Sequence, residues 1–114
     1  METMFHIMRG STPVLRFSMP IGTDANAVIY ATFSQDDAPV LEYRRGGEAG
    51  SVDAGGELTL GSGGELRISM TQADTLQLRA GSVLVQFRIR TAVGADVSLP
   101  CRGVVGDVRK GGVI

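Results

Sequence analysis

The segment 83–90 has a strictly alternating pattern of side chains. One parity is apolar throughout, whereas the other is mostly polar and includes Arg88 and Arg90. Successive side chains of a β-strand point to opposite faces. The pattern therefore predicts a strand with one face in a core and the other directed toward water or a partner.

The same period of two recurs along the chain, between connections rich in glycine, proline, aspartate and asparagine. The predicted strands cover 4–8, 14–19, 28–35, 40–44, 57–60, 65–70, 83–90 and 96–105. Sheets with one apolar face must stack to bury it. We therefore predict an all-β fold, an antiparallel β-sandwich of Ig-like type with about seven or eight short strands.

Two connections have the composition of tight hairpin turns. Asp36 to Pro39 joins the strands 28–35 and 40–44, and Gly94 lies in the connection that follows 83–90. Each turn predicts an antiparallel pair of neighbouring strands. Pro100 within 96–105 lacks a backbone N–H, so it predicts an edge or a bulge at that point.

One short helical turn is expected near residues 72–76. Thr71 and Asp74 have the spacing of a capping box, in which each side chain accepts a hydrogen bond from the other residue's backbone N–H. Asp stands where Glu or Gln is usual, which favours a single turn. Leu76 and Leu78 would then close an open end of the two sheets.

The length and the pattern indicate one domain over residues 1–114. Within it, the region 46–64 is a glycine-rich loop that we expect to be mobile and to contain one small strand. The segment 109–114 is expected to be a flexible tail. Its last residues, Val113 and Ile114, are apolar, and docking on a partner is the alternative.

Composition excludes several classes of function. The formal net charge of −1 provides no long-range field for polyanions, so nucleic-acid binding is disfavoured. The single cysteine, Cys101, cannot form an intramolecular disulfide, which fits a cytoplasmic protein. No apolar run approaches the length of a membrane span, and the N-terminus lacks the pattern of a secretory signal, so no membrane association is expected.

The chain offers little material for catalysis or metal binding. His6 is the only histidine, and Cys101 has no base beside it in sequence. Asp36 and Asp37 lack the spacing of a calcium loop, and the glycine clusters lack that of a phosphate loop. We therefore predict no catalytic, cofactor-binding or metal-binding residues, no cofactor and no enzymatic activity.

Three arginines are the candidate interface residues: Arg67, Arg88 and Arg90. If the strand 65–70 lies near the strand 83–90, they form a basic stripe that could grip carboxylates of a neighbouring subunit, with Arg79 close in sequence. The alternative is a solvated face on which these arginines pair within the chain, with Glu65 or Glu57.

Four segments carry a resemblance to a known group of proteins. They are 7–13 (Ile-Met-Arg-Gly-Ser-Thr-Pro), 31–35 (Ala-Thr-Phe-Ser-Gln), 70–76 (Met-Thr-Gln-Ala-Asp-Thr-Leu) and 85–91 (Val-Gln-Phe-Arg-Ile-Arg-Thr). In these the chain resembles small prophage-encoded all-β proteins of Gram-positive bacteria, carried among tail and baseplate genes. The order of elements is also similar to the N-terminal domain of phage baseplate upper proteins. The region 46–64 and the first three residues depart from that pattern.

The resemblance implies a non-enzymatic phage or prophage structural protein, a tail or baseplate subunit. Its partners would be other phage structural proteins and further copies of itself, in the cytoplasm of the bacterial host and then in the virion. The alternative is an Ig-like binding module that recognises carbohydrate or a host surface. Sugar sites usually stack rings on aromatic side chains, and this chain has no tryptophan and only Tyr30 and Tyr43.

Overall fold

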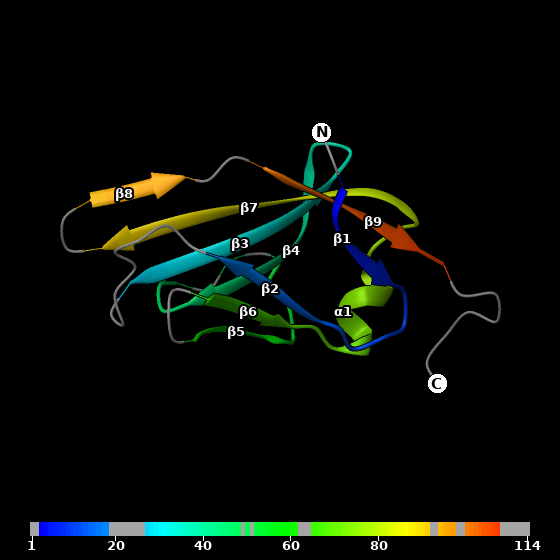
Figure 1. Cartoon of the computed structure of the whole chain (residues 1–114), viewed down its shortest axis with the longest axis horizontal. Helices are drawn as coiled ribbons and strands as arrows, with labels where there is room; N and C mark the ends of the chain where they lie inside the picture. The colour runs from blue at the N-terminus through cyan, green and yellow to red at the C-terminus, as the bar shows by residue number, and fades with distance from the viewer. Residues whose placement is uncertain are drawn as a thin grey trace.

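The computed structural model describes residues 3–18, 27–48, 50, 52–61, 65–91, 94–97 and 100–107. In this part of the chain nine strands form two sheets, and one short helix joins the smaller sheet to the larger (Figure 1). The predicted all-β, sandwich-like fold is confirmed.

The larger sheet has six strands. Its order is β1 (Thr3–Met8), β9 (Cys101–Gly106), β7 (Gly81–Thr91), β3 (Val28–Gln35) and β4 (Ala38–Arg45), and β8 (Gly94–Val97) also pairs with β7. The smaller sheet has the order β2 (Val14–Ser18), β6 (Glu65–Ser69) and β5 (Glu57–Leu60). The strand expected at 4–8 is β1, and it lies at an edge of the larger sheet.

The predicted alternation decides which side chains form the core. Ile29, Ala31 and Phe33 are completely buried, as are Leu66 and Ile68 of the opposite sheet. Their neighbours along each strand face away from the core and are half-buried or exposed. Residue 19, the last of the strand expected at 14–19, lies outside the described residues.

Aromatic rings join the two sheets. The ring of Phe17, on the smaller sheet, meets those of Phe5 and Phe87, on the larger sheet, at centroid distances of 5.7 and 4.9 Å. Both contacts are edge-on, the arrangement that the charge distribution of the rings favours. Stacking of the sheets therefore buries a continuous aromatic cluster.

One strand pair departs from the antiparallel prediction, because β1 pairs with β9 in parallel. β1 is followed by a strand of the other sheet, so no hairpin turn fixes its direction, and the long intervening chain permits a parallel pair. The pairing also depends on Gly103. A Cβ there would lie 2.2 Å from the ring of Phe5, so no larger residue fits without movement.

The run expected as one strand at 96–105 consists of two. β8 and β9 both pair antiparallel with β7, at opposite ends of it, and Pro100 lies in the connection between them. The predicted neighbour relation is confirmed, and the predicted irregularity at Pro100 is a break between strands, since proline has no N–H to donate.

The hairpin between β3 and β4 turns at Asp36 and Asp37. Both residues have positive φ angles, 52° and 61°, as type I′ turns require. Gln35 pairs with Ala38 and Ser34 with Pro39, but Phe33 pairs with Leu41, so Val40 is an extra residue. This β-bulge shifts the register of the rest of the hairpin by one residue.

The predicted helical turn is α1 (Gln72–Gln77), and its capping box is present. Thr71 Oγ1 accepts from the Asp74 N–H at 3.1 Å, and an Asp74 carboxylate oxygen accepts from the Thr71 N–H at 3.2 Å. Leu78 is completely buried, whereas Leu76 is only half-buried. Figure 1 shows α1 at the end of the sandwich opposite to β8.

The glycine-rich region contains β5, as expected, and also covers one edge of the larger sheet. The N–H of Glu42 donates to the carbonyl of Val52 at 2.9 Å, and the N–H of Ala54 donates to the carbonyl of Glu42 at 3.0 Å. Part of the outer edge of β4 is thus paired. The tail predicted at 109–114 lies outside the described residues.

Candidate functional site: the outer face of the larger sheet

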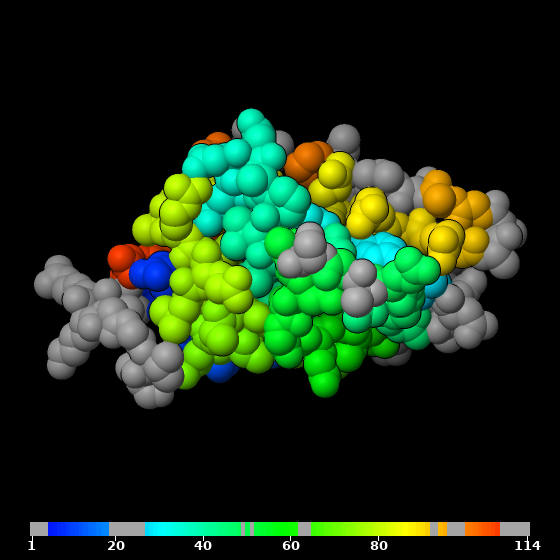
Figure 2. All heavy atoms as spheres, turned by 180° about the vertical axis from the view of Figure 1, so that it is seen from behind, coloured from blue at the N-terminus to red at the C-terminus, as the bar shows by residue number. Residues whose placement is uncertain are grey.

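Strand register places a tyrosine between two arginines on the outer face of the larger sheet. Tyr30 in β3 lies opposite Arg88 of β7 on one side and opposite Arg44 of β4 on the other. Because Ile29 and Ala31 face the core, Tyr30 faces outward. Seen from behind in Figure 2, side chains of β7 (yellow) reach the surface beside those of β3 and β4 (cyan to teal).

The side chains of this row contact one another. The guanidinium of Arg88 lies 4.7 Å from the centre of the Tyr30 ring, a cation–π arrangement. An Arg88 N–H also donates to Glu42 Oε2 at 3.2 Å, and the hydroxyl of Thr32 donates to the same oxygen at 2.9 Å. We call these residues the outer-face cluster: Tyr30, Thr32, Glu42, Arg44 and Arg88.

The loop after β4 supports the cluster from one side. The N–H of Glu48 donates to the hydroxyl of Tyr30 at 3.2 Å. Arg44 forms an ion pair of 3.6 Å with Asp53. Glu42 is only 14% exposed, whereas the Arg88 side chain is 54% exposed. The carboxylate therefore holds the arginine in place, and about half of the arginine side chain still faces solvent.

The structure brings together two of the three predicted interface residues. Arg88 and Arg90 lie on the outer face of β7, but Arg67 lies on β6, in the opposite sheet, and faces outward there. The expected stripe does not form, because strands β6 and β7 belong to different layers. Arg79 lies at neither place and pairs with Asp36 at the β3–β4 turn.

Arg67 instead follows the alternative prediction of pairing within the chain. Its Nε lies 2.5 Å from Glu65 Oε1, and Arg16, directly opposite on β2, lies 3.7 Å from the same oxygen. The hydrogen bond from Arg67 is the main reason that the pKa of Glu65 is lower than usual. On the outer face of the smaller sheet, two arginines thus share one carboxylate.

A trough crosses the outer face beside the cluster. It has a volume of about 230 Å³ and is lined by Thr32, Ser34, Asp37, Leu84, Gln86 and Pro100. We call this hollow the outer-face trough. A second hollow of about 370 Å³ adjoins it at the β3–β4 turn and shares Ser34, Asp37 and Leu84 with it. Leu84 contributes an exposed apolar side chain to both hollows.

A second polar cluster lies inside the molecule, where Asp74 is only 1% exposed. Its carboxylate accepts four hydrogen bonds of 2.7–3.2 Å, from the N–H groups of Gly55, Gly56 and Thr71 and from the hydroxyl of Tyr43. Burial alone would raise the pKa of Asp74, but these donors together lower it below the usual range. The buried anion therefore anchors the glycine-rich segment to α1.

Tyr43 acts only as a donor in this arrangement. Burial, and then the neighbouring carboxylate of Asp74, raise the pKa of its hydroxyl far above the usual value. These effects favour the protonated hydroxyl, which is the form that donates to Asp74. The pair therefore has the character of a structural contact.

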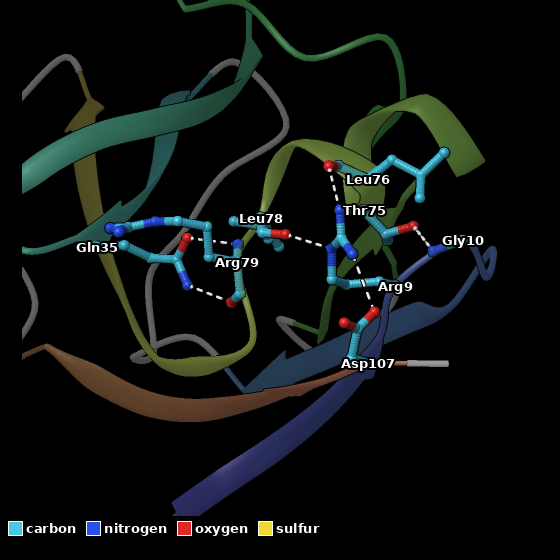
Figure 3. A network of polar contacts seen from close by, with 8 residues as sticks. All are labelled: Arg9, Gly10, Gln35, Thr75, Leu76, Leu78, Arg79 and Asp107. Carbon is cyan, nitrogen blue, oxygen red and sulfur yellow. Dashed lines mark hydrogen bonds and ion pairs between the residues drawn. The ribbon is translucent and has the colours of Figure 1, made fainter. Parts of the chain in front are cut away.

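Arg9 fixes the other end of α1 (Figure 3). Its Nε and one terminal nitrogen donate to the carbonyls of Leu78 and Leu76 at 2.7 and 3.2 Å, and the other terminal nitrogen lies 2.9 Å from Asp107 Oδ1. The last carbonyls of a helix lack partners within it, and an arginine is suited to satisfy them. One side chain thus joins β1, α1 and the end of β9.

Gln35 fixes the connection from α1 to β7 in the same view. Its Oε1 accepts from the N–H of Arg79 at 2.9 Å, and its Nε2 donates to the carbonyl of Arg79 at 2.7 Å (Figure 3). Both ends of the side chain are used, and Gln35 is only 6% exposed. This glutamine therefore fixes the wall of the second hollow, which Gln35 and Arg79 both line.

The remaining candidate residues lie apart from one another. His6 is exposed on β1, Cys101 packs against the core at the start of β9, and Asp36 and Asp37 form the hairpin turn. Among the residues that the structure describes, no group of three or more His, Cys, Asp or Glu side chains is arranged to hold a metal ion.

Sequence reasoning missed Tyr30, Glu42 and Arg44 as members of the candidate site. A signal was present for Tyr30, because it has the outward parity of its strand and β3 is the natural neighbour of β7. The positions of Glu42 and Arg44 depend on the bulge at Val40, which the sequence pattern does not mark.

Two comparisons with known proteins give no match. No protein-family model matches the chain, and a search of curated proteins finds no significant match. Within the described residues, no helix combines the length and the apolar character needed to span a membrane.

Proposed function

We propose that the chain is a non-enzymatic structural subunit of a phage or prophage tail or baseplate, which acts by assembling with other proteins. The observation that carries this proposal is the outward-facing row of Arg44, Tyr30 and Arg88 on the larger sheet, in which both arginines are exposed. Tyrosine and arginine are enriched at protein interfaces, where they contribute much of the binding energy.

The organisation around α1 also supports the proposal. Two of the segments that carry the resemblance meet there, since the Gly10 N–H donates to Thr75 Oγ1 and that hydroxyl donates to the carbonyl of Ser11, both at 3.0 Å. These segments stabilise the fold around α1, and these polar groups form hydrogen bonds within the chain. The outer face of the larger sheet, in contrast, leaves donors exposed for a partner.

The alternative, an Ig-like module that binds carbohydrate or a host surface, has less support. Tyr43 is 2% exposed, and the guanidinium of Arg88 lies over the ring of Tyr30. Neither ring presents the open face on which a sugar stacks. A protein partner fits the exposed side chains better.

Size-exclusion chromatography with light scattering tests the proposal, on the protein alone and mixed with the products of neighbouring genes. We expect a discrete complex with itself or with one of these proteins. Arg88→Glu should weaken that complex, whereas Arg67→Glu, on the opposite sheet, should leave it unchanged. A strict monomer that binds none of these proteins, together with selective binding to a glycan array, would favour the alternative.

A further inference from the structure

We infer that the outer face of the larger sheet binds an extended segment of a partner protein that carries an acidic and an apolar side chain four residues apart. This inference rests on the proposed function and specifies the partner of the same site. It follows from the order of side chains along β7, from their charges and from the shape of the trough.

The outward side chains of β7 change in character along the strand. Arg90 and Arg88 come at one end, Gln86 follows, and Leu84 lies at the other end in the trough. Arg88 and Leu84 are four residues apart, which corresponds to about 13 Å in a strand. An extended segment laid along β7 has the same repeat, so its own side chains four residues apart reach both positions.

The arginine end of the face offers guanidinium N–H donors to a partner. A guanidinium has five N–H donors, and Arg88 uses one of its terminal nitrogens for Glu42. Within the described part of the chain, Glu42 is the carboxylate that pairs with Arg88, and no ion pair involves Arg90. A carboxylate from a partner would therefore find two guanidiniums on one face, the arrangement that favours charge-assisted hydrogen bonds.

The leucine end suits an apolar side chain. Leu84 faces away from the core and is 37% exposed. It lies on the floor of the trough, which Pro100 and Asp37 help to line. Covering Leu84 with an apolar group removes apolar surface from water and stabilises the complex.

Asp37 influences which end of the bound segment carries the acidic side chain. Its carboxylate lines the trough at the leucine end and repels a second acidic group there. A polyanion such as a nucleic acid would carry phosphates along the whole trough, including beside Asp37, and is therefore disfavoured. Arg102 of β9 also lies opposite Leu84, but it is a single cation beside the carboxylate of Asp37. The two guanidiniums of Arg88 and Arg90 therefore place the acidic side chain of the partner at the arginine end.

The test uses fluorescein-labelled peptides and fluorescence anisotropy with the whole chain. The probe is Gly-Glu-Thr-Thr-Thr-Leu-Gly, and three matched peptides replace Glu by Gln, replace Leu by Ala, or omit one Thr. We expect the probe to bind about tenfold more tightly than each matched peptide. Arg88→Gln and Leu84→Ser should each reduce its affinity about tenfold, and Arg88→Lys should restore part of it.

Arg67→Gln is the matched control, because Arg67 is also an exposed outward arginine of a sheet but lies on the opposite layer. If Arg67→Gln and Arg88→Gln weaken binding equally, the attraction is non-specific charge and the inference is wrong. Tighter binding of oligothymidylate than of the probe also overturns it. Circular dichroism of each variant checks that the fold is retained.

The outcomes separate this inference from the proposed function. If no peptide binds at about 1 mM while assembly with tail proteins still depends on Arg88, the inference fails and the proposed function stands. If the probe binds as expected but the protein assembles with no tail component, the site recognises such a segment in another setting and the proposed function fails.

Discussion

The hydroxyl of Tyr43 donates a hydrogen bond of 2.8 Å to the carboxylate of Asp74, inside the molecule between β4 and α1. The contact joins the larger sheet to the helix and holds a buried negative charge. Removal of this hydrogen bond should therefore destabilise the whole fold.

Tyr43→Phe should lower the free energy of unfolding by about 1.5–3 kcal/mol, the usual range for a hydrogen bond to a charged group. The ring still fills its place in the core, so the change isolates the hydroxyl. Urea unfolding followed by circular dichroism measures the effect. Tyr30→Phe is the control, because the Tyr30 hydroxyl accepts one exposed N–H. Equal effects of the two changes would show that the buried hydrogen bond contributes no more stability than the exposed one.

Asp74 should make stability depend on pH. Its pKa in the folded protein is lower than the value of about 3.9 in an unfolded chain. The stabilisation is therefore complete above the unfolded pKa and is lost as the pH falls through the folded pKa. Asp74→Asn should lower the free energy of unfolding at pH 7 by about 2–4 kcal/mol. In the variant, the free energy of unfolding should also decrease less steeply as the pH is lowered into the acid range.

The comparison needs urea unfolding of both proteins at neutral and acidic pH. The pKa of Glu65 is also lowered, and this residue remains in the variant. Glu65→Gln separates that exposed component. An Asp74→Asn variant that loses stability in acid as steeply as the parent protein would rule out Asp74 as the source.

Arg9→Met should loosen α1. The methionine keeps much of the apolar stem but leaves the carbonyls of Leu76 and Leu78 without their donor. We expect a loss of about 1–3 kcal/mol in the free energy of unfolding and faster hydrogen exchange at the Gly10 N–H, which donates to Thr75 of α1. Arg16→Met is the control, since Arg16 is 62% exposed. Unchanged exchange at Gly10 would contradict the role of Arg9.

Gly103→Ala should displace β1, because the added Cβ meets the Phe5 ring. We expect a cost of about 1–3 kcal/mol, typical of overpacking. Gly94→Ala is the control, since nothing lies within 4 Å of the Cβ position there. In a double-mutant cycle, Phe5→Leu should relieve part of the cost of Gly103→Ala. Strict additivity would show that the two residues do not touch in solution.

The layers of the fold could be predicted from the sequence because the period of two is strong where both sheets bury one face. The same pattern says nothing about which strands share a sheet. Inward side chains of β6 and β7 look alike in sequence, yet the strands lie in opposite layers. The sequence therefore permits both a stripe that joins Arg67 to Arg88 and a separate face for Arg67, and the structure has the second arrangement.

The candidate site depends on the β-bulge at Val40, which no local sequence pattern indicates. Counting back from the turn at Asp36 and Asp37 without a bulge would place Tyr30 opposite Tyr43. The extra residue Val40 shifts the pairing, so that Arg44 lies beside Tyr30 and Tyr43 enters the core. A shift of one residue exchanges the two faces of a strand. Burial of Leu41 and Tyr43 selects the bulged register, which only the packed structure reveals.

The parallel contact between β1 and β9 has a consequence for biosynthesis. The ribosome makes β1 long before β9, and the bond from Arg9 to Asp107 spans 98 residues of chain. Until β9 emerges, β1 has no strand beside it in the larger sheet, so the nascent protein exposes the edge of β7 and part of the aromatic cluster. Contacts so distant in sequence slow folding, and completion of the sheet is therefore a late step in the production of each molecule.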